Sequence, residues 1–274
     1  MRIRTSSLPT SRALRTTAVI LAAGLSSACL TVEETANNFR YGSMTIRATA
    51  GGQGPVTARP TASFFSGPDA ALPSSRVTSD QCSVEFFREE AFLPGNLTPG
   101  SSVELSVGDE SFELTEEPGT PRLYTLGGSG TFTYDVGDTV TVTVPGAAGG
   151  FPGSQIQVRL AEPMRVGAQT PPSVNSGNYA LTWQPDGDDN SGVLLSMRFG
   201  SFANEGVADR QLFCVLQDDG AFTVPESSLG EYLSSVPELR SINMTRWRTR
   251  TVNVDERTRF YIVSSADTTL FDAP

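Results

Sequence analysis

Residues 138–146 read DTVTVTVPG, a segment in which valine and threonine alternate strictly. Successive side chains of a strand point to opposite faces, so Val140, Val142 and Val144 share one face. β-Branched residues in this pattern are typical of a strand that packs one face on a core. Comparable short runs between glycine, proline and aspartate turns follow from Tyr41 onward, and together they predict an all-β protein.

The segment 103–115, VELSVGDESFELT, predicts the register of its own hairpin. A two-residue turn that begins with glycine is a common hairpin loop, and Gly108–Asp109 fits this type. The cross-strand pairs on the apolar face are then Val103 with Leu114 and Leu105 with Phe112. The pairs on the polar face are Ser106 with Ser111 and Glu104 with Glu113.

Glu104 and Glu113 would therefore lie opposite each other, with their Cβ atoms about 5 Å apart. Two close carboxylates can act as an acid–base pair in glycoside hydrolysis, or form half of a cation site. They can also be two exposed glutamates that tolerate mild repulsion, which is the simpler interpretation because no aromatic cluster lies nearby in the sequence. A carboxylate-based hydrolase of envelope glycans is the alternative function that this pair would support.

Residues 166–178, VGAQTPPSVNSGN, combine proline, glycine, serine and asparagine without periodicity. This composition is typical of a loop or linker. We therefore predict two antiparallel β-sandwich domains, residues 41–165 and 174–274, joined by a linker at 166–173. Within the second domain, the segment 227–235 predicts a helix of a turn or two.

The second predicted domain contains LTW, then PDGDDNSG, then VLLSMRF, all within residues 181–199. This stretch resembles the region around the second and third strands of fibronectin type III and other immunoglobulin-like modules. The resemblance is confined to these residues. It implies that the two sandwiches are of the immunoglobulin or fibronectin type III kind.

The chain begins MRIRTSSLPTSRALR, with four arginines and no acid, and the apolar segment TTAVILAAGL follows. A basic start, a short apolar core and a small-residue exit describe a secretory signal peptide. The apolar segment is about half as long as a transmembrane helix requires. We therefore expect an exported protein rather than one held by a membrane-spanning helix.

This signal ends in LSSACL, in which two small residues precede Cys29. The motif resembles the lipobox of bacterial lipoproteins, except that Ser26 stands where the family usually has leucine. The resemblance implies that residues 1–28 are removed, that Cys29 carries several acyl chains such as palmitate, and that 29–40 form a lipidated tether. Stable anchoring requires more than one chain, which this modification supplies.

The residue after the lipidated cysteine directs sorting in some proteobacterial lipoproteins, and Leu30 in place of aspartate implies the outer membrane. Whether the body faces the periplasm or the exterior stays open. Two alternatives remain for Cys29: cleavage by ordinary signal peptidase, which gives a secreted or periplasmic product, and a buried or paired cysteine. The layout of lipobox and β modules is similar to lipoproteins of high-GC, myxobacterium-like genomes.

The chain has three cysteines, so lipidation of Cys29 leaves Cys82 and Cys214 as a possible disulfide. In QCSVEF and QLFCVLQ each cysteine shares a strand face with apolar neighbours, so both are expected to point inward. A disulfide is plausible in an oxidising compartment, although the two residues fall in different predicted domains. Two buried free thiols are the equal alternative.

All 20 basic residues are arginine, and the chain has neither histidine nor lysine. These absences exclude histidine-based catalytic triads, histidine metal ligands, Schiff-base chemistry and phosphate-binding lysine loops. After removal of the leader, 16 arginines face 30 acids, a formal charge of −14. Such a body repels nucleic acid and anionic lipid, so we predict no nucleic-acid partner. The missing histidine and lysine lead us to predict that the protein is not an enzyme.

Two further motifs carry weaker hypotheses. Asp186, Asp188 and Asn190 have the odd spacing of a calcium loop, which would suit a Ca²⁺-dependent adhesive module. Ser191 replaces the required glycine and Met197 replaces the bidentate glutamate, so a solvated turn is the simpler interpretation. No other cofactor is indicated.

The second motif is NMTRWRTRTV, in which Arg246, Arg248 and Arg250 share a strand face opposite Trp247. This basic patch could bind an anionic partner, a glycan or the chain's own acids. An exposed strand protected by charge against edge pairing is the simpler interpretation. Taken together, the sequence predicts a membrane-anchored lipoprotein that acts as a non-enzymatic binding or structural module of the cell envelope, with a protein or glycan partner.

Overall fold

The computed structural model describes residues 39–49, 55–70, 72, 76–87, 95–127, 130–167, 170–173, 177–188, 190–200 and 207–272. All described residues belong to the unit 38–274, and the predicted signal peptide and Cys29 lie outside the described residues. The described residues form 15 strands, one α-helix, α1 (Glu226–Ser234), and a 3₁₀ helix, η1 (Pro237–Leu239). The predicted all-β class and the short helix at 227–235 are both confirmed.

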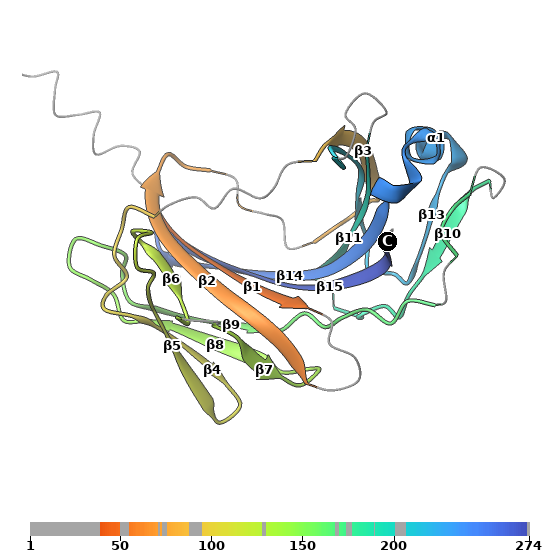
Figure 1. The fold of residues 1–274 in the computed structure, drawn as a ribbon. Coiled ribbons are helices and arrows are strands. Elements are labelled where there is room, and N and C mark those ends of the chain that lie inside the picture. Colours follow the sequence, from red (N-terminus) through yellow and green to blue (C-terminus); the bar gives the residue numbers. More distant parts are fainter. Residues whose placement is uncertain are drawn as a thin grey trace, which may run out of the picture. The chain divides into compact units, whose positions relative to one another are not determined.

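Thirteen of these strands belong to one large sheet, and two form a small sheet (Figure 1). In spatial order the large sheet contains β3 (Gln81–Phe86), β12 (Arg210–Leu216), β11 (Ser191–Phe199), β14 (Ser241–Asp255), β15 (Thr258–Asp272), β1 (Phe39–Thr49), β2 (Val56–Gly67), β6 (Leu123–Thr125), β5 (Glu110–Glu116), β4 (Val103–Val107), β8 (Thr139–Val144) and β9 (Ser154–Arg159). β7 (Phe132–Tyr134) also pairs with β2, and the small sheet consists of β10 (Tyr179–Thr182) and β13 (Ala221–Val224).

The hairpin predicted at 103–115 has the predicted register. Val103 pairs with Leu114, and Glu104 pairs with Glu113. Gly108 has a φ of +57°, a conformation that glycine adopts without a Cβ clash. The alternating strand at 138–146 is also confirmed as β8, whose three valines are buried while its threonines are more exposed.

A first hydrophobic cluster forms around β1, β2, β4 and β8. The rings of Phe64, Phe151 and Phe260 pack at its centre, with centroid distances of 4.9–6.0 Å. Gly42 on β1 makes room for them, because a Cβ there would lie 2.7 Å from the Phe260 ring. Phe260 and Ile262 come from β15, so a late strand of the chain packs into the same cluster as the early strands β1 and β2.

A second hydrophobic cluster lies among β10, β11, β12, β13 and α1, and β14 adds Ile242 and Met244 to it. Most residues of the first cluster precede the predicted boundary at 166–173 and most residues of the second follow it, but strands pair across this boundary. β3 precedes the boundary and pairs with β12, which follows it. β15 pairs in parallel with β1 across the same boundary, and the other pairs among the described strands are antiparallel.

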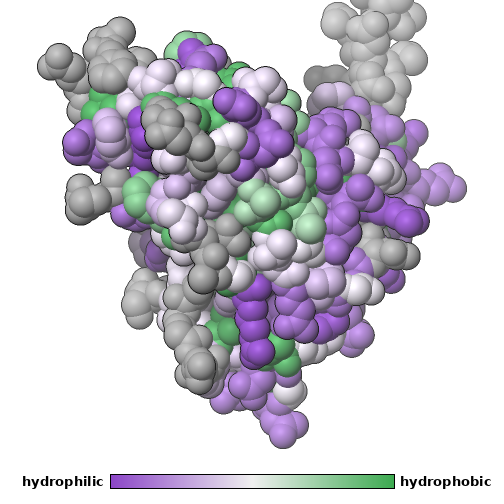
Figure 2. Space-filling model, turned by 90° about the vertical axis from the view of Figure 1, so that its right-hand side faces the viewer, coloured by the Kyte–Doolittle hydropathy of each residue, from purple (hydrophilic) through white to green (hydrophobic). Residues whose placement is uncertain are grey.

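The large sheet therefore contains strands from both predicted domains. The described strands do not form a separate set of sheets on each side of the boundary. The immunoglobulin or fibronectin type III character of the modules stays a prediction. The face shown in Figure 2 is mostly hydrophilic, with small hydrophobic groups between the polar residues. No helix within the described part of the chain is long and apolar enough to cross a membrane.

Candidate functional site

The arginines predicted to form an exposed patch are mostly buried. Arg246 is 4% exposed and Arg248 is 1% exposed, because this face of β14 lies toward the protein interior as far as Arg248. Arg250 is exposed, and Trp247 is half-buried on the opposite face. The expectation of a surface patch for an anionic partner is therefore wrong for Arg246 and Arg248, as is their interpretation as edge protection.

Arg248 binds carboxylates from two distant loops. Its Nε donates to Oδ2 of Asp186 at 2.6 Å, and its Nη2 donates to Oδ1 of the same carboxylate. Nη1 donates to the carbonyl oxygen of Leu160 at 2.9 Å, and Nη2 also reaches Oε1 of Glu162 at 3.3 Å. Every nitrogen of this guanidinium has a partner within the chain.

Arg159 at the end of β9 completes a ring of alternating charges. Its Nη2 lies 3.1 Å from Oε1 of Glu162, and its Nη1 lies 3.6 Å from Oδ1 of Asp186. We call Arg159, Glu162, Asp186 and Arg248 the arginine–acid cluster. Two cations and two anions balance within it, which is what burial of charge requires.

Arg246 lies two residues before Arg248 on β14 and has a partner of its own. Its Nε lies 2.8 Å from Oδ2 of Asp218 as a buried ion pair, and its Nη2 donates to Oδ1 at 3.1 Å. The indole Nε1 of Trp183 donates to the same Oδ1 at 2.8 Å. Of an anionic partner, a glycan and the chain's own acids, the chain's own acids are what these two arginines bind.

A buried tyrosine lies beside the arginine–acid cluster. The Tyr134 hydroxyl donates to the carbonyl oxygen of Ala161. Burial, with a smaller contribution from Glu162, raises the pKa of Tyr134 above its ordinary value of 10.0, while Arg248 opposes this shift. The ion pairs of the cluster hold two loops against β14, and its charged groups pair with one another.

Asp186, the first ligand of the predicted calcium loop, belongs to the arginine–acid cluster. Both carboxylate oxygens of Asp186 bind Arg248. Asp188 instead accepts a hydrogen bond from the backbone N–H of Asn190 at 2.9 Å, as in an Asx turn. Within the described residues no group of three acidic, cysteine or histidine side chains is placed to hold a metal.

The opposed glutamates of the β4–β5 hairpin are both exposed. Glu104 accepts a hydrogen bond from the Ser111 hydroxyl at 2.7 Å. The hydrolase alternative required two acids that face each other inside a cleft, and an exposed hairpin face does not provide it.

Cys82 and Cys214 lie directly opposite each other on β3 and β12, and their Sγ atoms are 2.07 Å apart in a disulfide. Cys214 is buried as expected. Cys82 does not point into the core, because every residue of β3 is exposed at the edge of the sheet. The bond joins segments separated by 132 residues.

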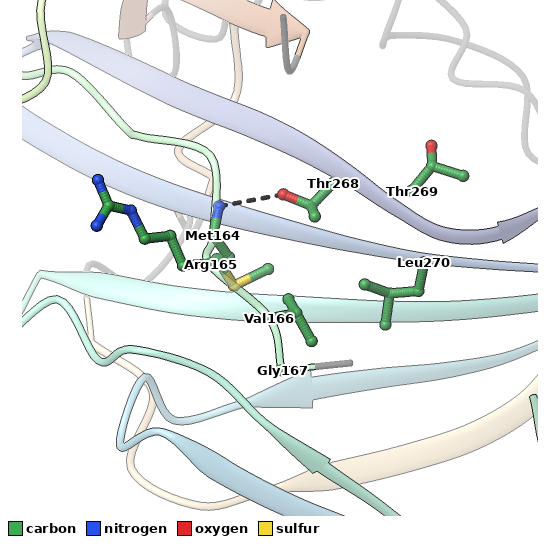
Figure 3. A pocket seen from close by; sticks show the side chains of 7 residues that line it. All are labelled: Met164, Arg165, Val166, Gly167, Thr268, Thr269 and Leu270. Carbon is green, nitrogen blue, oxygen red and sulfur yellow. Dashed lines mark hydrogen bonds between the residues drawn. The ribbon is translucent and has the colours of Figure 1, made fainter. Parts of the chain in front are cut away.

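A shallow pocket of about 440 Å³ lies between the end of β15 and the segment that follows β9 (Figure 3). It is lined by Met164, Arg165, Val166, Gly167, Thr268, Thr269 and Leu270. The backbone N–H of Met164 donates to Oγ1 of Thr268 at 3.1 Å, and the Arg165 side chain points away from Leu270 (Figure 3). Among the lining residues are hydroxyl and apolar side chains and the arginine Arg165, but no carboxylate or thiol, so the pocket has no acid–base pair.

No local pattern in the sequence marks Glu162 and Asp218 as partners of the arginines. One signal could have pointed to the buried face. Arg246 and Arg248 have the same parity as apolar residues on both sides of them in β14, namely Ile242, Met244, Val252 and Val254. Neither a protein-family model nor a curated protein matches this chain.

Proposed function

We propose that the chain is an exported lipoprotein, anchored to the outer membrane through Cys29, whose body is a non-enzymatic binding or structural module of the cell envelope. The observation that carries this proposal is the LSSACL motif after a basic and apolar leader. Residues 30–38 lie between Cys29 and the start of β1, and nine residues span at most about 30 Å. The body would thus stay close to the bilayer.

The disulfide supports the export step. Disulfides persist in oxidising compartments and are rare in the reducing cytosol. Cys82 is at an exposed edge strand, where a reducing environment would have access to it. A chain with this bond is suited to the periplasm or the exterior.

The arrangement of acids supports a binding or structural role. Glu162, Asp186 and Asp218 are each paired with an arginine, and Glu104 and Glu113 lie on an exposed hairpin. The chain also lacks histidine and lysine, which narrows the groups available for catalysis. A protein or glycan partner, bound by immunoglobulin-like β modules, fits this set of observations.

Replacement of the lipidated residue tests the proposal. In a Cys29→Ser variant we expect the protein to leave the membrane fraction, and in the unmodified chain we expect an intact mass that starts at Cys29 and includes acyl chains. Ser26→Leu restores the residue usual in the lipobox and serves as a control that should remain in the membrane fraction. Membrane fractionation of Cys29→Ser identical to that of the original chain would overturn the anchor.

A further inference from the structure

The two outer strands of the large sheet differ in what they expose. β9 forms one end of the sheet, and its apolar residues Ile156 and Val158 are buried while its outward side chains are polar or charged. β3 forms the other end and is exposed along its whole length, with Val84 37% exposed and Phe86 61% exposed. Natural edge strands are normally protected by charge, proline or short length, and this protection is present at β9 but weak at β3.

Exposed apolar residues gather near β3. Among the described residues, four large apolar side chains are exposed, and two of them are Val84 and Phe86. A third, Val207, lies two residues before Asp209, whose carbonyl oxygen accepts a hydrogen bond from Phe87 N at 2.8 Å. Such a concentration at one sheet edge marks an interaction surface.

The backbone of β3 also directs hydrogen-bonding groups outward. Cys82 and Cys214 have Cα atoms 4.1 Å apart, the short spacing of a non-hydrogen-bonded antiparallel pair. The N–H and C=O groups of Cys82, Val84 and Phe86 therefore point away from β12. No strand of the described chain pairs with that side of β3.

We propose that β3 pairs antiparallel with β3 of a second copy of this chain, with the two-fold axis at Val84. This register places Val84 opposite Val84 of the second copy, as a pair that exchanges both main-chain hydrogen bonds. Cys82 then faces Phe86, so apolar groups meet on one face. Ser83 faces Glu85 on the other face, where a hydroxyl can donate to the carboxylate, and no like charges oppose each other.

A second copy suits this edge because the strand is complementary to itself in that register. A two-fold interface uses the same patch on both partners and closes without forming a fibre. The body of the protein is acidic, but an arginine lies beside β3, so the charge near this strand does not prevent two copies from pairing. The Arg210 guanidinium lies 4.7 Å from the centre of the Phe86 ring and forms a salt bridge with Glu231 at 3.0 Å.

The proposal is tested by the mass of the processed protein in solution, purified in detergent with its disulfide intact and measured by sedimentation equilibrium. We expect a reversible dimer. Val84→Lys and Val84→Glu each place like charges at the two-fold axis, and each should raise the dimer dissociation constant about tenfold or more. An equimolar mixture of the two variants should restore the dimer, because lysine then faces glutamate.

Val136→Lys provides the control, since Val136 is also an exposed valine, 61% exposed against 37% for Val84, on another part of the described chain. It should dimerise as the original chain does. A strictly monomeric original chain would overturn the proposal. A dimer that neither charged variant weakens, or a mixture that stays monomeric, would also overturn it. These outcomes do not depend on Cys29 lipidation, because the charge pairing acts at β3 alone.

Discussion

Arg248 and Asp186 form a two-point ion pair in which each side chain is only 1% exposed. The arginine belongs to β14 and the aspartate to the loop between β10 and β11, so the pair ties that loop to the large sheet. A buried pair of this kind contributes little net stability against an apolar replacement of both partners. Removal of one partner is costly, because it leaves the other charge buried.

We therefore expect Arg248→Met to lower the free energy of unfolding by about 3–5 kcal/mol. Arg159 lies 3.6 Å from Asp186 and compensates only in part. The double variant Arg248→Met with Asp186→Leu should recover much of the loss, and Arg250→Met at an exposed position of the same strand should change stability little. Urea unfolding measures all three, and a double variant as unstable as the single one would contradict this account.

The disulfide between Cys82 and Cys214 should stabilise the whole chain as well as the edge strand. It closes a loop with a sequence separation of 132, for which the chain-entropy model gives about 5 kcal/mol, and native disulfides typically contribute about 2–5 kcal/mol. A Cys82→Ala, Cys214→Ala variant should lose stability in this range. Hydrogen exchange should show β3 amides losing protection first, and unchanged protection of β3 would argue against the edge-strand role.

Stability should vary little with pH around neutrality, because the chain has no histidine, the side chain that ordinarily titrates there. Above pH 10 it should fall. Burial raises the pKa of Tyr232 above its ordinary value of 10.0, with Arg240 opposing the shift, so the unfolded chain releases this proton at a lower pH than the folded chain. The stabilisation is fully present below pH 10 and is lost as the pH rises toward the folded pKa.

Tyr232→Phe isolates this effect. The Tyr232 hydroxyl is buried without a hydrogen-bond partner in the described structure, so its removal should change stability little at pH 7. At pH 11 the variant should lose less stability than the original chain, as read from urea midpoints at the two pH values. Equal alkaline losses in both proteins would show that another group is responsible.

The opposed glutamates of the β4–β5 hairpin provide a test of cross-strand electrostatics. Glu113→Arg places a guanidinium opposite Glu104 on an exposed face and should raise stability by about 0.2–1 kcal/mol. Glu110→Arg, opposite Val107 in the same hairpin, is the control with no opposed acid. The gain should shrink at high salt, and a gain of the same size in the control would point to net charge instead.

Local features of the fold could be read from the sequence. The hairpin register from Val103 to Leu114 and the buried valines of β8 follow from alternation and turn chemistry among residues close in the chain. These interactions act over a few residues, so the composition of each segment suffices to specify them. The same pattern placed Arg246 and Arg248 on one face of a strand, which the structure also shows.

Whether that face lies inside or outside depended on distant parts of the chain. Asp186 and Asp218 come from loops that no local pattern connects to β14, and their carboxylates make burial of the arginines possible. The pairing of β3 with β12 and the parallel pairing of β1 with β15 are equally remote in sequence. Alternation along one strand shows which side chains share a face. Only the packing of the complete sheet decides which face is desolvated and which charges meet there.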